Sequence, residues 1–232
     1  RDIFIADLDT RICNLYYDLL IRNIFYNHKK NLMVNEELMT KRIKRIKEDG
    51  ELYLMFDIRK SGLTLDHDLI KILFEELDSL TNNVYDFNSQ YIRIRDQIVY
   101  IDGNPINPCR GMGLGMLNSM YTVIMLIISD MLENDAIFFS DDNVFKLETS
   151  NEYEVEKILL TYEKFNFLIN YRKIKISNMF IILEQYYKEE DIFPADKDTR
   201  VLMPLFNQIF QSSDRKRKES IHSLYRSSFI GD

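Results

Sequence analysis

Three acidic side chains stand close to the ends of short apolar segments. Asp57 follows the run Leu52–Phe56, and Asp141 and Asp142 come just after the run Ala136–Phe139. A carboxylate at the end of a buried strand is held rigidly and stays open to solvent on one side. Carboxylates brought together repel one another, which proteins tolerate mostly where a divalent cation neutralises them. Because Asp57 and Asp141 are 84 positions apart in the sequence, only folding could unite them.

Asp141 and Asp142 are neighbours, and neighbouring side chains on a strand point to opposite faces. Two adjacent acids therefore serve one site only where a tight turn separates two strands. The short runs 136–140 and 144–147 around Asp141-Asp142-Asn143 predict such a hairpin, with the acids at its tip. The plainer interpretation of each acid alone is an ordinary turn residue, since Asp is common in turns.

A glycine cluster forms the second candidate site. Gly111, Gly113 and Gly115 are three of the seven glycines of the chain. In a sequence this poor in glycine, the cluster indicates a backbone that bends sharply or lets a ligand approach closely. It precedes a predicted helix with Asn118 and Ser119, whose amides and side chains could meet phosphate or sugar. The spacing fits neither a Walker loop nor the dinucleotide fingerprint, and a flexible loop is the plainer interpretation.

Two runs of basic residues could track phosphates. Five positive charges fall within residues 41–47, and four stand in a row at 215–218. The net charge of −7 argues mildly against a surface that is positively charged overall and binds nucleic acid. The hypothesis of phosphate binding therefore depends on these local clusters of positive charge. A solvated helix face or tail explains either run equally well. The residues are Lys41, Arg42, Lys44, Arg45 and Lys47, and Arg215, Lys216, Arg217 and Lys218.

The composition fits a folded protein of one large or two small domains. Of the 232 residues, 46% are hydrophobic and 29% charged, so the chain can bury a core of ordinary size. Two cysteines are too few for a disulfide framework, and three scattered histidines lack metal-ligand spacing. No apolar stretch approaches the roughly 20 residues that span a bilayer, so we expect no membrane span. Because the first residue is Arg1 and not Met, we expect a piece of a longer polypeptide.

Periodicity and turn signals predict the elements that must position these residues. Apolar residues recur at intervals of three and four and predict a helix over 7–27, at Leu8, Ile12, Leu15, Tyr16, Leu19 and Leu20. Asp66 is typical of a helix cap, and Asp102-Gly103 of a hairpin. The other expected elements are strands at 52–56, 136–140, 144–147 and 180–187, a partly alternating segment at 91–100, and helices at 117–132 and 152–165. This order predicts an α+β fold, an antiparallel sheet with helices on one face.

The order of these parts resembles the palm of RNA-dependent RNA polymerases of RNA viruses, through the motifs called A to E. An acid follows a strand, a glycine loop leads into a helix, a hydrophobic strand leads into Asp-Asp, and a helix and a lysine-bearing segment follow. The resemblance runs from about Arg1 to Tyr187 and is nearest to narna-like and related fungal-virus polymerases, with a likeness to segmented negative-strand enzymes in Arg1–Ile5. It implies a right-hand polymerase palm with a ferredoxin/RRM-like sheet.

Carried over by position, the resemblance assigns roles to the acids. The family's first metal-binding aspartate falls on Asp57, and its catalytic pair falls on Asp141 and Asp142. These residues would hold two Mg²⁺ ions, roughly 3.5–4 Å apart, with Mn²⁺ as a possible substitute. Ser140 occupies the place where most members have glycine, a variant that some viral groups share.

The resemblance also implies residues that meet the nucleotide and the RNA. Lys173 would be the proton donor to pyrophosphate, with Lys175 as the alternative. Residues 182–187 would support the primer strand as motif E. Nucleotide-binding residues would be Arg1, Arg11, Ser61, Gly62, Gly111, Gly113, Gly115, Asn118 and Ser119. RNA-binding residues would be Lys41, Arg42, Lys44, Arg45, Arg110, Tyr186, Arg215, Lys216 and Arg217.

Three parts of a larger viral replicase are implied. Residues 1–50 would be partial fingers that contain the end of motif F, 51–190 the palm with a fingers insertion near 81–105, and 191–232 the start of the thumb or a C-terminal extension. The implied activity is template-directed RNA synthesis in the host cytoplasm or mitochondrion. The partners would be an RNA template, a primer or nascent strand, ribonucleoside triphosphates, and the remaining fingers and thumb or a partner polymerase subunit.

Two other activities stay open. Asp57 and the residues after it also resemble motif A of bacterial and intron-type reverse transcriptases, which exclude ribonucleotides with a bulky aromatic about five residues after the aspartate. Here that place is Gly62, with Ser61 and Leu63 beside it, so a 2′-hydroxyl has room and Ser61 could bond to it. Most positive-strand polymerases have a second aspartate near this place, so sugar selection must differ in this chain. The third hypothesis is a catalytically silent RNA-binding palm or the partner half of a divided polymerase, and the intact acids argue against silence.

Overall fold

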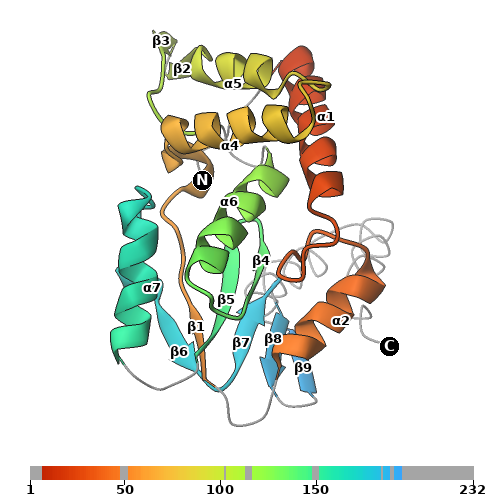
Figure 1. Ribbon diagram of the computed structural model, residues 1–232. Helices are drawn as coiled ribbons and strands as arrows, with labels where there is room; N and C mark the ends of the chain where they lie inside the picture. The colour runs from red at the N-terminus through yellow and green to blue at the C-terminus, as the bar shows by residue number, and fades with distance from the viewer. Residues whose placement is uncertain are drawn as a thin grey trace, which may run out of the picture.

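The computed structural model of the chain describes residues 7–47, 52–101, 103–112, 117–147, 152–183, 185–188 and 191–194. Its elements are arranged as Figure 1 shows. The helices are α1 (Leu8–Ile24), α2 (Glu36–Ile46), α3 (Ser61–Thr64), α4 (His67–Leu80), α5 (Phe87–Arg95), α6 (Asn118–Met131) and α7 (Glu152–Lys164), with a 3-10 turn, η1 (Tyr171–Lys173). The strands are β1 (Leu52–Met55), β2 (Val99–Ile101), β3 (Asn104–Ile106), β4 (Ala136–Phe139), β5 (Asp142–Leu147), β6 (Lys175–Ser177), β7 (Phe180–Ile182), β8 (Gln185–Lys188) and β9 (Asp191–Pro194).

A four-stranded sheet in the order β4-β5-β1-β6 joins segments that are far apart in the sequence. Each neighbouring pair is antiparallel, and Leu54 of β1 lies opposite Phe145 of β5 and Ile176 of β6. The apolar runs around the acids therefore become adjacent strands. The α+β fold with an antiparallel sheet that the sequence predicts is confirmed.

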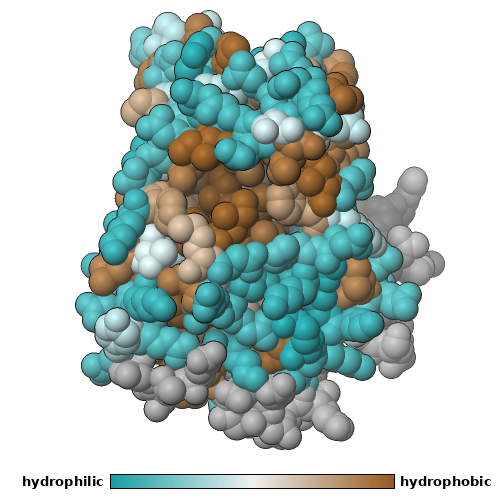
Figure 2. All heavy atoms as spheres, viewed as in Figure 1, coloured by the Kyte–Doolittle hydropathy of each residue, from teal (hydrophilic) through white to brown (hydrophobic). Residues whose placement is uncertain are grey.

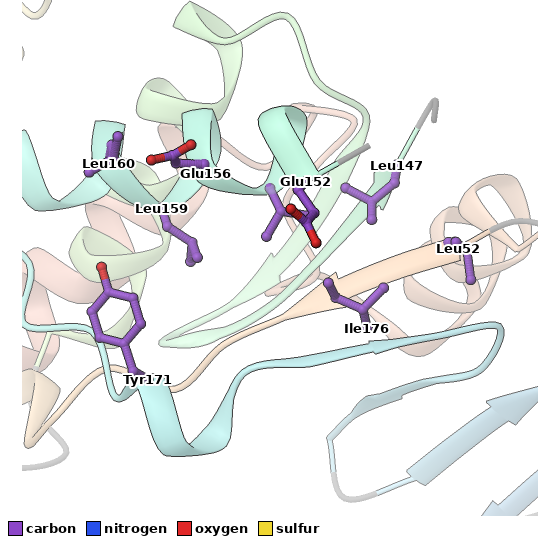
Figure 3. A pocket seen from close by; sticks show the side chains of 9 residues that line it. Leu52, Leu147, Glu152, Glu156, Leu159, Leu160, Tyr171 and Ile176 are labelled. Carbon is purple, nitrogen blue, oxygen red and sulfur yellow. The ribbon is translucent and has the colours of Figure 1, made fainter. Parts of the chain in front are cut away.

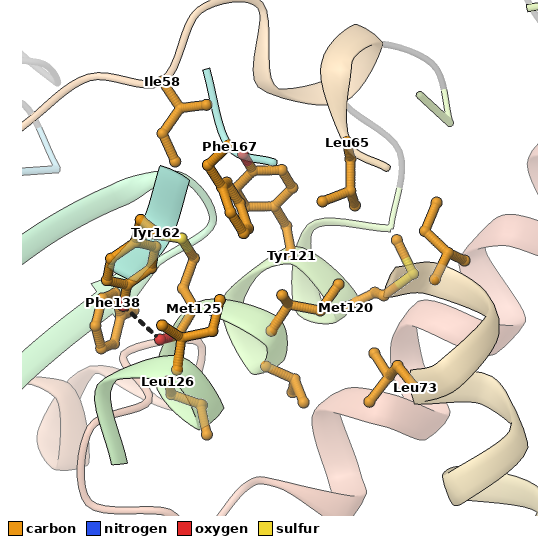
Figure 4. Packing of buried hydrophobic residues seen from close by; sticks show 14 of the residues in the cluster. Ile58, Leu65, Leu73, Met120, Tyr121, Met125, Leu126, Phe138, Tyr162 and Phe167 are labelled. Atoms are coloured by element: carbon orange, nitrogen blue, oxygen red, sulfur yellow. Dashed lines mark hydrogen bonds between the residues drawn. The ribbon is translucent and has the colours of Figure 1, made fainter. Parts of the chain in front are cut away.

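The helices α6 and α7 cover one face of this sheet. α6 is apolar on nearly all sides and is buried along most of its length, because it packs against β4 and against α1. In the larger core, the rings of Tyr121 and Tyr162 both meet Phe167 edge to face (Figure 4). The buried hydroxyl of Tyr162 donates to the Met125 carbonyl at 2.7 Å, so this polar group is paired inside the core.

The opposite face of the sheet is covered by α2 and by a second sheet, β7-β8-β9. Successive side chains of β1 point to opposite faces of the sheet. Leu54 therefore lies in the larger core, and Tyr53 and Met55 lie in a smaller core on the other face. The rings of Tyr53 and Phe180 meet edge to face, with 4.9 Å between their centroids. The prediction of helices on one face thus holds for α6 and α7, and α2 lies on the other face.

The partly alternating segment 91–100 is divided between the end of α5 and the start of β2. Asp86 caps α5, because its side chain accepts a hydrogen bond from an amide of the first turn. Phe87, Tyr91 and Ile94 are buried at helical spacing. The alternation covers only a few residues, while the buried residues of this segment follow the helical period.

Two hairpins turn at a residue whose backbone is in the left-handed conformation. β2 and β3 pair as predicted, and Gly103 between them has a φ of +80°. Residues 180–187, predicted as one strand, form two strands, because Leu183 has a φ of +53° and turns the chain. Ile182 of β7 then lies opposite Gln185 of β8. Apolar content alone does not show such a turn, since leucine rarely adopts this conformation.

The predicted first helix is confirmed as α1, but most of its apolar stripe faces solvent. Five of its large apolar side chains are 47–70% exposed: Leu8, Ile12, Leu15, Tyr16 and Leu19. The residues of α1 that are buried are Asn14 and Ile21. Apolar side chains also gather in a hollow over α6, below α4 (Figure 2). In the ranges given above, no helix has both the length and the apolar character to cross a membrane.

Candidate active site

The ends of β1 and β4 bring Asp57 and Asp141 to the same end of the sheet. Because β1 and β5 are antiparallel, the residues just after β1 lie beside those just before β5. The turn of the predicted hairpin consists of Ser140 and Asp141, since Phe139 pairs with Asp142. The hairpin is therefore confirmed with a shift: Asp142 begins β5 and does not stand at the tip.

A hydrogen bond ties the two acidic segments together. The hydroxyl of Ser61, four residues after Asp57, donates to Oδ2 of Asp141 at 2.8 Å. Both carboxylates also act on one buried phenol: burial raises the pKa of Tyr121, and the charges of Asp141 and Asp57 raise it further. The hydroxyl of Tyr121 has no hydrogen-bond partner among the described residues. Two acids that are distant in the sequence therefore share one small region of the fold.

The side-chain amide of Asn143 connects the backbone beside both acids. Its Oδ1 accepts from the amide of Phe56 at 3.1 Å, and its Nδ2 donates to the carbonyl of Phe56 at 2.7 Å. Nδ2 also donates to the carbonyl of Asp141 at 3.0 Å. Phe56 directly precedes Asp57, so one side chain joins the two acidic segments. The sequence indicated Asn143 only as a hairpin residue, and no spacing signal marks this role.

Ser140 stands at the hairpin tip in left-handed backbone, with a φ of +55°. Glycine adopts this conformation without steric cost, which is a physical reason for a glycine at the equivalent place of the polymerases that the sequence resembles. The amide of Ser140 donates to Oγ1 of Thr122 at 2.7 Å, and its hydroxyl donates to Oδ1 of Asn118 at 3.1 Å. These bonds hold the tip against the first two turns of α6.

Lys173 and Asn170 lie beside Asp57. The ammonium of Lys173 and the amide Nδ2 of Asn170 are each 3.1 Å from Oδ2 of Asp57. The backbone amide of Asn170 also donates to the Asp57 carbonyl at 2.8 Å, so the chain before η1 follows the end of β1. The side chain of Lys173 is 62% exposed. Lys175, the alternative proton donor, pairs with Met55 through the backbone of β6, and its side chain is exposed.

The glycine cluster begins against α3. Gly111 has a φ of +86°, and a Cβ there would lie 2.7 Å from the backbone of Leu63, so a side chain does not fit. The amide of Gly111 donates to the Leu65 carbonyl at 2.7 Å. The loop therefore starts from the segment that carries Ser61. Gly113 and Gly115 lie outside the described residues.

Two of the predicted ligand-binding residues are engaged with the protein itself. Arg110, expected to bind RNA, donates to the carbonyls of Thr64 at 2.8 Å and Asn166 at 2.6 Å. Ser119, expected near the ribose, is buried, and its amide and hydroxyl donate to Asp18 at 2.7 and 3.1 Å. Of the two ribose candidates, Asn118 is the one that contacts the hairpin tip.

The basic run on α2 divides between buried and exposed side chains. Arg42 is buried and donates to the carbonyls of Asn31 and Tyr26, so it secures the segment before α2 and is not available to RNA. Arg45 is ion-paired with Asp135 at 2.6 Å. Composition alone cannot show such burial, because a basic run is usually solvated. The exposed members that remain for RNA are Lys41 and Lys44.

The other predicted residues are spread over the fold. Arg11 is exposed on α1, and Gly62 is buried in α3. Tyr186 belongs to β8, and its side chain is not among those described. Like Gly113 and Gly115, four more predicted residues lie outside the described ranges: Arg1, Arg215, Lys216 and Arg217.

The chemistry of the acids suits a hard divalent cation. Mg²⁺ prefers carboxylate oxygens and needs only one or two of them, because waters and phosphates complete its coordination. Asp57 and Asp141 supply such oxygens at the same end of the sheet, and Asp142 is exposed at the start of β5. In the described part of the chain, no three His, Cys, Asp or Glu side chains are grouped as a metal site. The fit therefore rests on two carboxylates, with Lys173 beside Asp57.

A groove of about 300 Å³ lies away from the acids, between α7 and the sheet (Figure 3). Its lining is mostly apolar and includes Leu52, Leu147, Leu159 and Ile176. None of the residues predicted to bind metal, nucleotide or RNA lines it. The candidate site is thus defined by its polar contacts and not by this groove.

No protein-family model matches the sequence, and a sequence search of curated proteins finds no match. Solved structures do match. The RNA-dependent RNA polymerase of a human picobirnavirus gives a TM-score of 0.65 at 15% identity, covering 82% of this chain and 39% of that chain. Its insertion-loop deletion mutant gives a TM-score of 0.65 at 16% identity, covering 82% of this chain and 41% of that chain.

At this identity the likeness shows a shared fold. The predicted resemblance to a viral RNA-dependent RNA polymerase is confirmed at the level of structure, and the narna-like type stays a prediction. The chain spans about two fifths of the length of the solved polymerases that it matches.

Proposed function

We propose that the chain carries the catalytic centre of a template-directed RNA polymerase. The observation that carries the proposal is the hydrogen bond from Ser61 to Asp141, which brings the acidic segments after β1 and β4 together. The fold that holds them is shared with solved viral RNA-dependent RNA polymerases. In this proposal residues 51–190 form the palm, 1–50 belong to the fingers, and 191–232 begin the thumb. The parts that complete the enzyme are further segments or a partner subunit.

The proposed residues have distinct roles. Asp57 and Asp141 would hold two Mg²⁺ ions or Mn²⁺, with Asp142 as a weaker ligand. When bound, these ions lower the pKa of the primer 3′-hydroxyl and neutralise charge on pyrophosphate. Ser61 orients the carboxylate of Asp141 through its 2.8 Å hydrogen bond. Lys173 carries a proton beside Asp57 and would deliver it to the leaving pyrophosphate.

The small residues after Asp57 favour a ribonucleotide. Ser61 and Gly62 stand where reverse transcriptases have a bulky aromatic residue. Because the Ser61 hydroxyl reaches Asp141, the sugar of a nucleotide held by the acids would lie close to it. A 2′-hydroxyl would then have both room and a hydrogen-bond partner. We therefore propose ribonucleoside triphosphates as substrates and RNA as template and primer, with Lys41 and Lys44 as phosphate contacts.

Primer extension by the full chain tests this function. A labelled RNA primer on an RNA template is offered ribonucleotides or deoxyribonucleotides, with Mg²⁺ or Mn²⁺. We expect ribonucleotide incorporation that Asp141→Ala abolishes, because the variant removes a proposed cation ligand. Asp96→Ala is the matched control, since it removes an exposed carboxylate that pairs with Arg95 at 2.7 Å, outside the site. This control should keep full activity.

Each other outcome has its own meaning for the proposal. A preference for deoxyribonucleotides would favour a reverse transcriptase. RNA binding without incorporation under any condition would favour a silent RNA-binding palm. Equal loss of activity in Asp141→Ala and Asp96→Ala would indicate damage to the fold, and circular dichroism of both variants would show it.

A further inference from the structure

Asn143 stands where the backbone pairing between β1 and β5 stops. The ladder between these strands ends with Leu54 opposite Phe145. Beyond it, both the amide and the carbonyl of Phe56 are paired by the side chain of Asn143, at 3.1 and 2.7 Å. The side chain thus continues the strand pairing where the two backbones separate.

The same amide closes the turn that carries the second acid. Nδ2 of Asn143 donates to the carbonyl of Asp141 at 3.0 Å. The partners fix the orientation of the amide, because the Phe56 amide needs an acceptor and the two carbonyls need a donor. One side chain therefore holds the peptide that precedes Asp57 against the backbone of Asp141.

This link is difficult to replace. Asn143 is 3% exposed, so bulk water cannot take over its hydrogen bonds. The ring of Phe56 is stacked on Phe145 with 5.6 Å between centroids and meets Tyr162 at 5.4 Å, so its backbone is not free to find other partners. Loss of the amide would leave buried backbone groups unpaired at the junction between the acids.

We infer that Asn143 is a positioning residue, which sets the separation of Asp57 and Asp141 and thereby the fit of a divalent cation between them. The inference rests on the proposed function, since the cation site belongs to it. Asn143 bonds to backbone on both sides and acts through the two acids. Replacing residues that orient metal ligands typically weakens metal affinity or activity by about 10–100-fold.

A matched pair of buried asparagines separates positioning from stability. Asn31 is 2% exposed and also joins backbone groups, since it donates to the Phe25 carbonyl at 3.1 Å and accepts from the Met33 amide at 2.8 Å. In the full chain, Asn143→Ala and Asn31→Ala are compared by Mn²⁺ dissociation constant and by thermal midpoint. Both should lower the midpoint. Only Asn143→Ala should weaken Mn²⁺ binding, by about 10–100-fold.

The outcomes distinguish the inference from the proposed function. If the wild type binds Mn²⁺ and the two folded variants bind it equally well, Asn143 is not a positioning residue and the function stands. If the wild type neither binds Mn²⁺ nor incorporates nucleotides, the function fails and the inference fails with it. If Asn143→Ala does not fold, Asn143→Ser and Asn31→Ser give the same comparison with a smaller loss of polar contact.

Discussion

Lys173 places a positive charge beside Asp57. Its ammonium lies 3.1 Å from Asp57, and 62% of its side chain is exposed. Because so much of the side chain is in solvent, Lys173 can leave the carboxylate without disturbing the core. Release from Asp57 would free the ammonium to act as a general acid.

We expect Lys173→Met to lower kcat by about 10²–10⁴-fold without abolishing synthesis, because a general acid contributes a factor of this size. Lys71→Met is the matched control, since Lys71 is an exposed lysine on α4 that pairs with Glu75 at 3.8 Å. Steady-state primer extension measures both variants. An unchanged kcat in Lys173→Met, with a loss in Lys175→Met, would move the role to Lys175.

Individual site residues were predictable where their neighbours in the sequence mark them. Asp57 and Asp141 are visible as acids after apolar runs, and the structure places them in one region with Lys173. Asn143 was missed because its partner Phe56 is 87 positions away and the bonds go to backbone. A side chain that bridges a gap between strands leaves no periodic pattern in the sequence.

At the scale of elements, another helix supplies the hydrogen-bond acceptor for a backbone amide in the first turn of α6. Leu117, at its N-cap, makes no side-chain capping bond, and Ser119 donates to Asp18 of α1 instead. Burial raises the pKa of Asp18, and the hydrogen bonds from Ser119 offset this only in part. The ionised carboxylate is therefore less stable in the folded chain than in the unfolded one.

Asp18→Asn should raise the free energy of unfolding near neutral pH, because the amide keeps an acceptor for Ser119 and removes the buried charge. The pKa of Asp18 is raised in the fold, so its ionisation weakens the fold at pH above the ordinary Asp range. Protonation removes this penalty, so the advantage of the variant should shrink as the pH falls toward about 4. Urea unfolding across this range measures it. Asp9→Asn, exposed on the same helix, is the control, and an advantage that grows as pH falls would contradict the prediction.

Elements were predictable where a local signal decides the structure. The Asp66 cap and the β2–β3 hairpin depend on neighbours in the sequence, and both are confirmed, although Asp102 itself lies outside the described residues. The basic run at 41–47 is different, because the burial of Arg42 depends on the loop before α2, where the carbonyls of Tyr26 and Asn31 accept its hydrogen bonds. Local sequence shows that such residues are charged and does not show that they are enclosed.

At the scale of the whole molecule, α1 shows what the periodicity of apolar residues cannot predict. The spacing of apolar residues indicated a helix, and α1 confirms it. Its exposed side includes Ile12, which is 57% exposed, whereas Ile21 on its other side is fully buried. Periodicity shows that an apolar face exists, but the rest of the fold determines which face is covered.

These two isoleucines allow a matched test of how the molecule covers α1. Ile21→Ala should lower the free energy of unfolding by about 2–5 kcal/mol, because it removes buried methyl groups and leaves a cavity. Ile12→Ala should change it by less than about 0.5 kcal/mol, since an exposed side chain loses little burial and Ala favours the helix. Urea unfolding of the full chain at two protein concentrations measures both variants. A loss at Ile12 that approaches the loss at Ile21 and grows with concentration would show that a second copy covers this face of α1 in solution.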